Sequence, residues 1–302
     1  MNLIKSVKQT TKARCFLLTS MAIFGTLAPF VRNVTVSSGE LALYRALLAI
    51  LLIGGFLLLT KQKINLRAIR RELPLLLVSG AAMGLNWIFL FEAYKYTTVA
   101  TATLSYYFAP VLVTIVCPFL FHYKMTKKQI LCFVMSTLGL ILIVGVGKGS
   151  GGNDFIGILF GLAAACLYAT VMVLNKFIKG VAGIPRTFLQ FVSAAIVLIP
   201  YVAFSGGITL GSLNGLGWGC LLTVGLVHSG IAYCMYFSSF EHLRGEEVAL
   251  LSYVDPLVAI FVGVFALGEP ITAWQIVGGA LILGFTLLCE LPSPKKCKKN
   301  NT

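Results

Sequence analysis

The chain has 302 residues, of which 58% are hydrophobic and 11% are charged, and its formal net charge is +14. A soluble domain carries about 25% charged residues, so this composition excludes a water-soluble globular protein and predicts an all-α integral membrane protein. A strongly basic chain can also bind nucleic acid, but the placement of the basic residues argues against that partner.

Apolar stretches of about 20 residues predict ten transmembrane helices. In chain order the predicted spans are Cys15–Val34, Leu41–Leu59, Leu73–Tyr94, Ala100–Phe121, Ile130–Val146, Phe155–Lys176, Arg186–Phe204, Leu216–Phe237, Val248–Leu267 and Ala273–Leu291. The basic start and the apolar run after it resemble a signal peptide, but no small-residue cleavage site ends the run. We therefore interpret it as the first permanent span.

The basic residues gather in alternate segments between the predicted spans. These segments contain 20 of the 24 Lys and Arg residues, namely Lys5, Lys8, Lys12, Arg14, Lys61, Lys63, Arg67, Arg70, Arg71, Lys124, Lys127, Lys128, Lys176, Lys179, Arg186, Arg244, Lys295, Lys296, Lys298 and Lys299. The other segments contain Arg32, Lys95 and Lys148. Because cytoplasmic loops are enriched in Lys and Arg, this pattern predicts a multi-pass protein of the inner or plasma membrane with both termini in the cytoplasm.

The sequence gives no sign of a metal site or a cofactor. Its eight cysteines are scattered and form no C-x-x-C pair, so neither a zinc site nor a disulfide framework is expected. No G-x-x-x-x-G-K loop is present, so ATP is not expected to drive the protein.

The chain contains an internal repeat. A shift of 146 residues aligns Gly84 with Gly230, Trp87 with Tyr233, Tyr107 with Tyr253, Pro110 with Pro256, Thr126 with Thr272 and Gln129 with Gln275. We therefore predict two related halves, residues 1–150 and 151–302, with five spans each. An odd number of spans inverts the second copy in the membrane, and such inverted repeats are typical of secondary transporters.

Several motifs resemble those of a known family. They are Ala22-Ile23-Phe24-Gly25, Tyr44-Arg45-Ala46, the stretch from Glu92-Ala93-Tyr94-Lys95-Tyr96-Thr97 to Pro110, Leu251-Ser252-Tyr253-Val254-Asp255-Pro256 and Leu267-Gly268-Glu269-Pro270-Ile271-Thr272. Over nearly the whole chain the sequence resembles the EamA family of the drug/metabolite transporter superfamily. The first half departs from the G-E-x-x-T ending, because Tyr123 stands where the acid would fall.

The resemblance implies ten helices in two inverted five-helix repeats. It also implies transport of amino acids, related metabolites or drug-like compounds, often outward, and it names no substrate. The expected partners are therefore a small-molecule solute and the lipid bilayer, with H⁺ as an optional coupling ion.

Two prolines predict helix breaks at corresponding positions of the halves. Pro110 deprives the carbonyl of Tyr106 of its helical hydrogen bond, and Pro256 does the same to Ser252. Free backbone polar groups at membrane depth are tolerated where they line a wet cavity. The paired breaks thus predict a central cavity, although either proline alone could be a packing kink.

Asp255 is the candidate of greatest interest, because a carboxylate at membrane depth costs at least about 2.5–3.5 kcal/mol on insertion scales. Three roles are open: counter-ion for a cationic solute group, proton carrier, or structural partner of Arg45 or Lys95. Its repeat counterpart is Ala109, so the carboxylate breaks the internal symmetry.

Other polar residues have weaker claims. Arg45 lies near the outward end of its span, where a long side chain can reach the surface, so we expect an anchor or an ion-pair partner in preference to a ligand contact. Glu92 is expected to pair with Lys95 one turn further on. His228 can relay protons, or more simply satisfy a backbone carbonyl of a neighbouring helix.

Aromatic residues are frequent near the middle of the predicted spans, where interfacial belts would not place them. The complete set of predicted substrate-binding or coupling residues is Asp255, Ser252, Tyr253, Tyr106, Tyr107, Asn86, Trp87, His228, Tyr233 and Tyr168. A cavity lined by aromatic side chains suits organic solutes.

The sequence as a whole favours a secondary transporter that works by alternating access around a site in the third, fourth, eighth and ninth spans. An enzyme is not expected, because no converging set of catalytic groups is evident. A channel lacks a recognisable filter sequence. A membrane receptor or scaffold that transports nothing, or an intramembrane enzyme, remains the alternative.

Overall fold

The computed structural model describes residues 2–62, 64, 69–122, 124–146, 153–239, 243 and 245–291. All regular secondary structure in these ranges is helical. The all-α class predicted from composition is therefore confirmed for the described part of the chain.

The first half of the chain forms seven helices: α1 (Asn2–Gly25), α2 (Leu27–Arg32), α3 (Ser38–Leu59), α4 (Leu73–Tyr96), α5 (Val99–Tyr106), α6 (Ala109–Leu120) and α7 (Lys127–Val146). The second half forms α8 (Asn153–Phe177), α9 (Gly183–Phe204), the 3₁₀ turn η1 (Leu210–Ser212), α10 (Gly215–Leu222), the π-helix η2 (Thr223–Ile231), α11 (Ala232–Ser239), α12 (Gly245–Ser252), α13 (Val254–Phe261), the π-helix η3 (Val262–Ala266) and α14 (Ala273–Glu290).

The ten predicted spans all fall on helical segments, some of them interrupted. Among the described residues seven segments are long and apolar enough to cross a membrane: Gln9–Arg32, Ser38–Leu59, Leu73–Tyr96, Val99–Leu120, Asp154–Phe177, Gly183–Phe204 and Gly215–Ser239. Val254–Ala266 and Ala273–Cys289 are shorter apolar helices. The chain is thus a multi-pass membrane protein, and the number of ten crossings stays a prediction.

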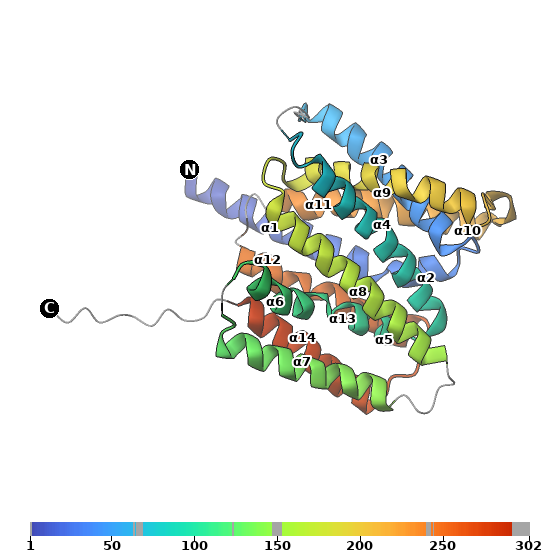
Figure 1. The fold of residues 1–302 in the computed structure, drawn as a ribbon. Helices are drawn as coiled ribbons and strands as arrows, with labels where there is room; N and C mark the ends of the chain where they lie inside the picture. The colour runs from blue at the N-terminus through green and yellow to red at the C-terminus, as the bar shows by residue number, and fades with distance from the viewer. Residues whose placement is uncertain are drawn as a thin grey trace.

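Helices of the two halves pack against one another throughout the molecule (Figure 1). α4 packs against α8 and α9, α3 packs against α9 and η2, and α1 packs against α11 and α13. α7 and α14 form a pair at one edge, where Gly139 and Gly278 allow their backbones to approach closely. Much of the core therefore lies between the two halves.

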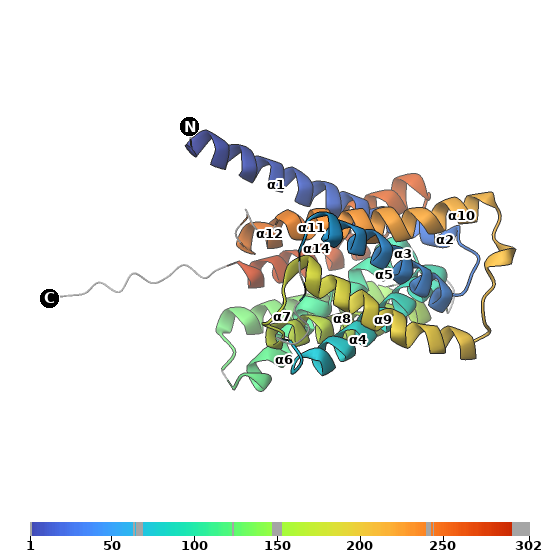
Figure 2. The same cartoon turned by 90° about the horizontal axis from the view of Figure 1, so that it is seen from above.

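The helices run between two ends of the molecule. The start of α1 and the end of α14 lie on the same side in both views (Figures 1 and 2). At this end, which we call the basic end, Arg14 pairs with Glu247, and Glu72 accepts hydrogen bonds from the backbone of Lys179 and Gly180.

At the other end, which we call the opposite end, Arg32 pairs with Glu269. There Glu40, at the start of α3, accepts hydrogen bonds from the backbone N–H and the hydroxyl of Thr209, which precedes η1. Each end is thus tied together by contacts between the two halves of the chain.

Candidate functional site

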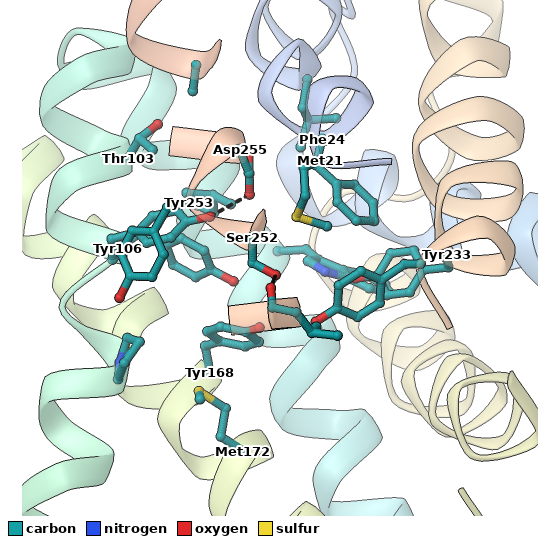
Figure 3. A pocket seen from close by; sticks show the side chains of 18 of the residues that line it. Met21, Phe24, Thr103, Tyr106, Tyr168, Met172, Tyr233, Ser252, Tyr253 and Asp255 are labelled. Carbon is teal, nitrogen blue, oxygen red and sulfur yellow. Dashed lines mark hydrogen bonds between the residues drawn. The ribbon is translucent and has the colours of Figure 1, made fainter. Parts of the chain in front are cut away.

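A cavity of about 550 Å³ lies between helices of both halves. Its lining comes from α1 to α6, α8 and α11 to α13, and comprises Met21, Phe24, Leu27, Arg45, Trp87, Leu90, Tyr94, Thr103, Tyr106, Tyr107, Pro110, Tyr168, Met172, Tyr233, Tyr236, Leu243, Val248, Ser252, Tyr253, Asp255 and Ala259. Figure 3 shows aromatic side chains approaching the cavity from several helices. A volume of this size is typical of sites for small organic ligands.

Most of the candidate residues meet in this cavity. The predicted residues that line it are Asp255, Ser252, Tyr253, Tyr106, Tyr107, Trp87, Tyr233, Tyr168, Pro110 and Arg45. They come from the third, fourth, eighth and ninth predicted spans, as expected, and also from the second and sixth. Most of the residues chosen from sequence are thus brought together in space.

Asn86, His228, Pro256 and Glu92 do not line the cavity. Asn86 donates a hydrogen bond to the carbonyl of Ala164 at 2.6 Å, so it joins α4 to α8. Pro256 is buried in α13. Glu92 pairs with Lys95 Nζ at 3.0 Å, as predicted. Neither Asn86 nor Glu92 is therefore positioned to contact a solute in the cavity.

His228 is 1% exposed and lies outside the cavity lining. Its Nε2 is 3.2 Å from the hydroxyl of Thr26, and its Nδ1 is 3.2 Å from the carbonyl oxygen of Thr223 in its own helix. Both ring nitrogens therefore have protein partners. This geometry matches the structural role considered for His228, although the carbonyl belongs to its own helix and not to a neighbouring one.

Both proline-containing segments are interrupted at corresponding places. α5 ends at Tyr106 and α6 begins at Ala109, whereas α12 ends at Ser252 and α13 begins at Val254. Tyr106 and Ser252, whose carbonyls lose their helical partners, both line the cavity (Figure 3). The two residues that carry the free carbonyls thus border the cavity, and such groups are tolerated at membrane depth beside a wet cavity.

Asp255 lies in the first turn of α13, and its carboxylate oxygen Oδ2 accepts a hydrogen bond of 2.7 Å from the hydroxyl of Tyr107. This bond connects the two helix breaks. Among the described residues, the ion pairs are those of Arg14, Arg32 and Lys95 with glutamates, so Asp255 pairs with neither Arg45 nor Lys95. The structural pairing considered for Asp255 is therefore wrong.

Aromatic rings form two groups in the cavity wall. Tyr106 stacks on Tyr168 at a centroid distance of 5.2 Å, whereas Phe24 meets Tyr233 edge to face at 5.1 Å. In Figure 3 Tyr106 and Tyr233 lie on opposite sides of the view, with Ser252 between them. The space between these groups offers apolar surface bordered by hydroxyl groups.

Arg45 differs from its predicted position near the surface. The side chain is 3% exposed, and its Nε donates a hydrogen bond of 2.6 Å to the hydroxyl of Ser229. The guanidinium carbon lies 4.6 Å from the Trp87 ring centroid and 5.7 Å from that of Phe91. The expected surface anchor and the expected ion pair are both wrong, because Arg45 lines the cavity and forms no ion pair among the described residues.

Sequence reasoning missed nine lining residues, namely Met21, Phe24, Leu27, Leu90, Thr103, Met172, Leu243, Val248 and Ala259. Tyr94 and Tyr236 also line the cavity, and both belong to the mid-span aromatic residues from which the sequence predicts a cavity wall. The aliphatic residues and methionines gave none, because they are as common in lipid-facing positions as in a cavity wall.

Glu269 joins several elements at the opposite end. Its Oε1 pairs with Arg32, and its Oε2 accepts a hydrogen bond of 2.7 Å from the backbone N–H of Val99, the first residue of α5. Arg32 also donates to the carbonyls of Tyr94 and Thr97 at 3.0 and 2.9 Å. Together, Arg32 and Glu269 connect α2, the α4–α5 junction and the loop before α14.

No group of three or more His, Cys, Asp or Glu side chains with a metal-binding arrangement occurs in the part of the chain that the structure describes. The cavity wall contains many aromatic rings, one carboxylate and one guanidinium. Such a site can hold a polar organic molecule by its charged ends and its apolar body.

Known proteins share both the sequence and the fold. The chain is 29% identical to the Uncharacterized transporter YxxF of Bacillus subtilis (strain 168) over 279 residues, which cover 92% of this chain and 89% of that protein. It is also 29% identical to an Uncharacterized transporter of Archaeoglobus fulgidus over 273 residues, with 89% and 93% covered.

A solved crystal structure aligns with a TM-score of 0.63 and 18% identity, covering 92% of this chain and 96% of the other, and this likeness concerns the fold alone. The sequence profile described as the EamA-like transporter family matches residues 11–145 and matches again at residues 155–289. These two matches include most of the chain and the cavity-lining residues of both halves. The protein therefore belongs to the EamA-like transporter family.

Proposed function

We propose that this protein is a secondary transporter that exports small organic solutes, such as amino acids or related metabolites and drugs, by alternating access to the central cavity. The single observation that supports this most is the cavity itself, because it places an intramembrane carboxylate and two helix breaks among aromatic walls. Family membership supports the transport class.

The proposal includes two inverted halves, residues 1–150 and 151–302. Their helix breaks correspond, and so do their hydrogen bonds: Thr126 and Gln129 before and within α7 exchange the same two bonds, of 2.8 and 3.2 Å, as Thr272 and Gln275 at α14. The packing corresponds too. The repeat aligns α4 with η2 and α11, α8 with α1, and α9 with α3. Accordingly α4 packs on α8 and α9, whereas α11 packs on α1 and η2 packs on α3. Related halves allow two near-equivalent conformations.

The contacts at the two ends suggest how the cavity would open to one side at a time. Arg14 and Glu247 join α1 to α12 at the basic end, whereas Arg32 and Glu269 join α2 to the loop before α14 at the opposite end. Loosening one pair while the other holds would expose the cavity to one side. The basic end is proposed to face the cytoplasm, in line with the placement of Lys and Arg.

Asp255 is proposed to bind a cationic group of the solute or to carry a proton. It has one neutral partner, Tyr107, and it lines the cavity. A carboxylate that exchanges a proton for a bound cation would couple export to proton entry. Outward direction and coupling belong to this proposal.

The proposal is tested with the purified full chain in proteoliposomes that contain a defined mixture of amino acids, amines and organic acids. Mass spectrometry measures which solutes leave, with and without an imposed proton gradient. We expect at least one solute to leave faster than from protein-free liposomes. In Asp255→Asn its rate should fall by about tenfold or more, as expected when a charge-assisted contact is lost.

Lys95→Gln serves as the matched control, since Lys95 pairs with Glu92 outside the cavity. Its flux should equal that of the parent. If no solute leaves faster than from protein-free liposomes although the protein is folded, the transporter proposal is wrong, and a receptor or scaffold is favoured. Unchanged flux in Asp255→Asn would remove this carboxylate from the mechanism.

A further inference from the structure

The guanidinium of Arg45 is a buried charge without an anionic partner. The side chain is 3% exposed, and the ion pairs among the described residues involve other cations. Its one hydrogen bond to a described residue goes from Nε to Ser229 Oγ, at 2.6 Å. A buried cation in a membrane segment is costly, so an unpaired one indicates that something else compensates its charge.

The protein groups around Arg45 orient the guanidinium but do not neutralise its charge. Ser229 is held in turn by the carbonyl of Val224 at 2.9 Å, which fixes the hydroxyl that receives Nε. The rings of Trp87 and Phe91 lie 4.6 and 5.7 Å from the guanidinium carbon, and cation–π contacts stabilise a cation without neutralising it.

The two terminal nitrogens of Arg45 have no hydrogen-bond acceptor among the described residues. Because Arg45 lines the cavity, a ligand there can reach them. A guanidinium presents its N–H donors as a rigid fork that matches the two oxygens of a carboxylate. The free side of Arg45 therefore suits a planar anion.

Asp255 provides a second charge of opposite sign in the same cavity wall, and Tyr107 is its neutral partner. Arg45 and Asp255 form no ion pair with each other, so neither neutralises the other. In the 146-residue repeat Arg45 corresponds to Phe191 and Asp255 to Ala109. Both charges thus break the internal symmetry, as expected of residues that serve an asymmetric ligand more than the shared scaffold.

We propose that Arg45 is the binding site for a carboxylate group of the solute. The cavity then takes molecules that carry a carboxylate at Arg45, an ammonium at Asp255 and an apolar body between the aromatic walls. This inference rests on the proposed function, because it specifies the class of solute that the transporter would carry.

Trp87 supplies a readout that is independent of transport, because its ring lies against the guanidinium. The chain has three tryptophans, and replacing the other two with Trp218→Phe and Trp274→Phe leaves Trp87 as the sole reporter. Trp218 and Trp274 are exposed, so these changes should be tolerated. The sole-tryptophan protein in detergent is titrated with phenylalanine, with 3-phenylpropionate, which lacks the ammonium, and with phenethylamine, which lacks the carboxylate.

We expect saturable changes in Trp87 fluorescence with phenethylamine, and also with the two carboxylate probes phenylalanine and 3-phenylpropionate, at millimolar concentrations. Arg45→Gln should weaken the affinity for these two probes by about tenfold or more, since a charge-assisted pair is lost, and should leave the response to phenethylamine at the parent level. Arg45→Lys keeps the charge without the forked arrangement of N–H donors, so its affinity for the two carboxylate probes should lie between those of the parent and Arg45→Gln. Lys95→Gln, which removes a cation outside the cavity, should bind all probes as the parent does.

Three results would overturn the inference. The parent could show no response to either carboxylate probe, Arg45→Gln could bind them as tightly as the parent, or all three probes could be weakened equally in Arg45→Gln and Arg45→Lys. Binding of carboxylates without any flux in proteoliposomes would contradict the transporter proposal and leave the Arg45 site supported. Flux of amines alone, with no binding of carboxylates, would contradict the Arg45 site and leave the transporter proposal supported.

Discussion

At the residue scale, the position of Asp255 depends on one phenol. The hydroxyl of Tyr107 donates a 2.7 Å hydrogen bond to Oδ2, and no other described side chain forms a hydrogen bond or an ion pair with this carboxylate. Because Tyr107 sits in the break between α5 and α6, it connects the first half of the chain to the charge in the second. This contact should therefore orient the carboxylate for the solute.

Replacing Tyr107 with Phe tests this role. The ring keeps its edge-to-face contact with Tyr106, but the carboxylate loses its donor. The apparent affinity for phenethylamine should therefore fall by about three- to tenfold. Titration of the sole-Trp87 protein measures the change. Tyr201→Phe is the control, since Tyr201 is 40% exposed on α9 and does not line the cavity. Equal affinity in Tyr107→Phe and the parent would contradict an orienting role.

The site residues that were easiest to identify from the sequence are residue types that are rare inside a membrane span. Asp255 and Pro110 stand out in apolar spans, and both line the cavity. Arg45 was misplaced because α3 begins at Ser38, so Arg45 lies about two turns inside the helix. His228 and Asn86 do not line the cavity. Their spans are apolar on all sides, so no period in the sequence tells which face meets the cavity.

At the element scale, a glycine allows two helices to meet beside the site. A Cβ on Gly25, the last residue of α1, would lie 2.6 Å from the carbonyl oxygen of Asp255 and 2.7 Å from Val258 Cβ. These distances are too short for a side chain. The close approach of α1 to α13 therefore requires glycine at this position.

Gly25→Ala should destabilise the protein by about 1–3 kcal/mol, because the backbones must move apart. Thermal unfolding in detergent should show a lower midpoint. Gly55→Ala is a matched control in α3, where an added Cβ would meet no heavy atom of the described residues within 4 Å. Its midpoint should be unchanged or slightly higher, owing to the better helix propensity of Ala. Equal midpoints for both variants would contradict the tight α1–α13 contact.

Replacing Glu269 should also lower the stability of the protein, through contacts at the opposite end. Glu269→Gln removes the ion pair with Arg32 and weakens the bond to the N-terminus of α5, where a negative charge is favoured. We expect about 1–2 kcal/mol of destabilisation by the same thermal measurement. Glu92→Gln breaks a more exposed pair with Lys95 and should change the midpoint little. A midpoint lowered as much by Glu92→Gln would argue against a special role for Glu269.

The helical ranges were largely predictable, because a run of apolar residues long enough to cross a bilayer leaves the backbone one choice. The breaks at Pro110 and Pro256 were predictable from the chemistry of proline. The break at Thr26 follows from the same chemistry, because Pro29 deprives the carbonyl of Gly25 of its helical hydrogen bond, but it was not predicted. The π-helical segments η2 and η3 were not predicted either.

At the scale of the whole molecule, the two ends of the helices differ in charge. At the basic end Arg14 pairs with Glu247, Arg70 and Arg71 precede α4, and Lys128 lies in the first turn of α7. At the opposite end Arg32 is the last residue of α2, and Lys95 lies in the last turn of α4. The cavity lies between these ends and is lined by helices of both halves. The central claim is that this cavity becomes accessible from each side in turn.

The most direct measurement of this claim uses a cysteine inside the cavity. The eight native cysteines are replaced, Ser252→Cys is introduced, and a membrane-impermeant thiol reagent is applied to either side of oriented vesicles. Thr60→Cys at the end of α3 and Ser205→Cys at the end of α9 serve as exposed controls, which should each react from one side only, and from opposite sides.

The account predicts that Ser252→Cys reacts from both sides, and that the vesicles remain sealed to the reagent. Reaction from one side only, under every imposed solute or proton gradient, would contradict alternating access.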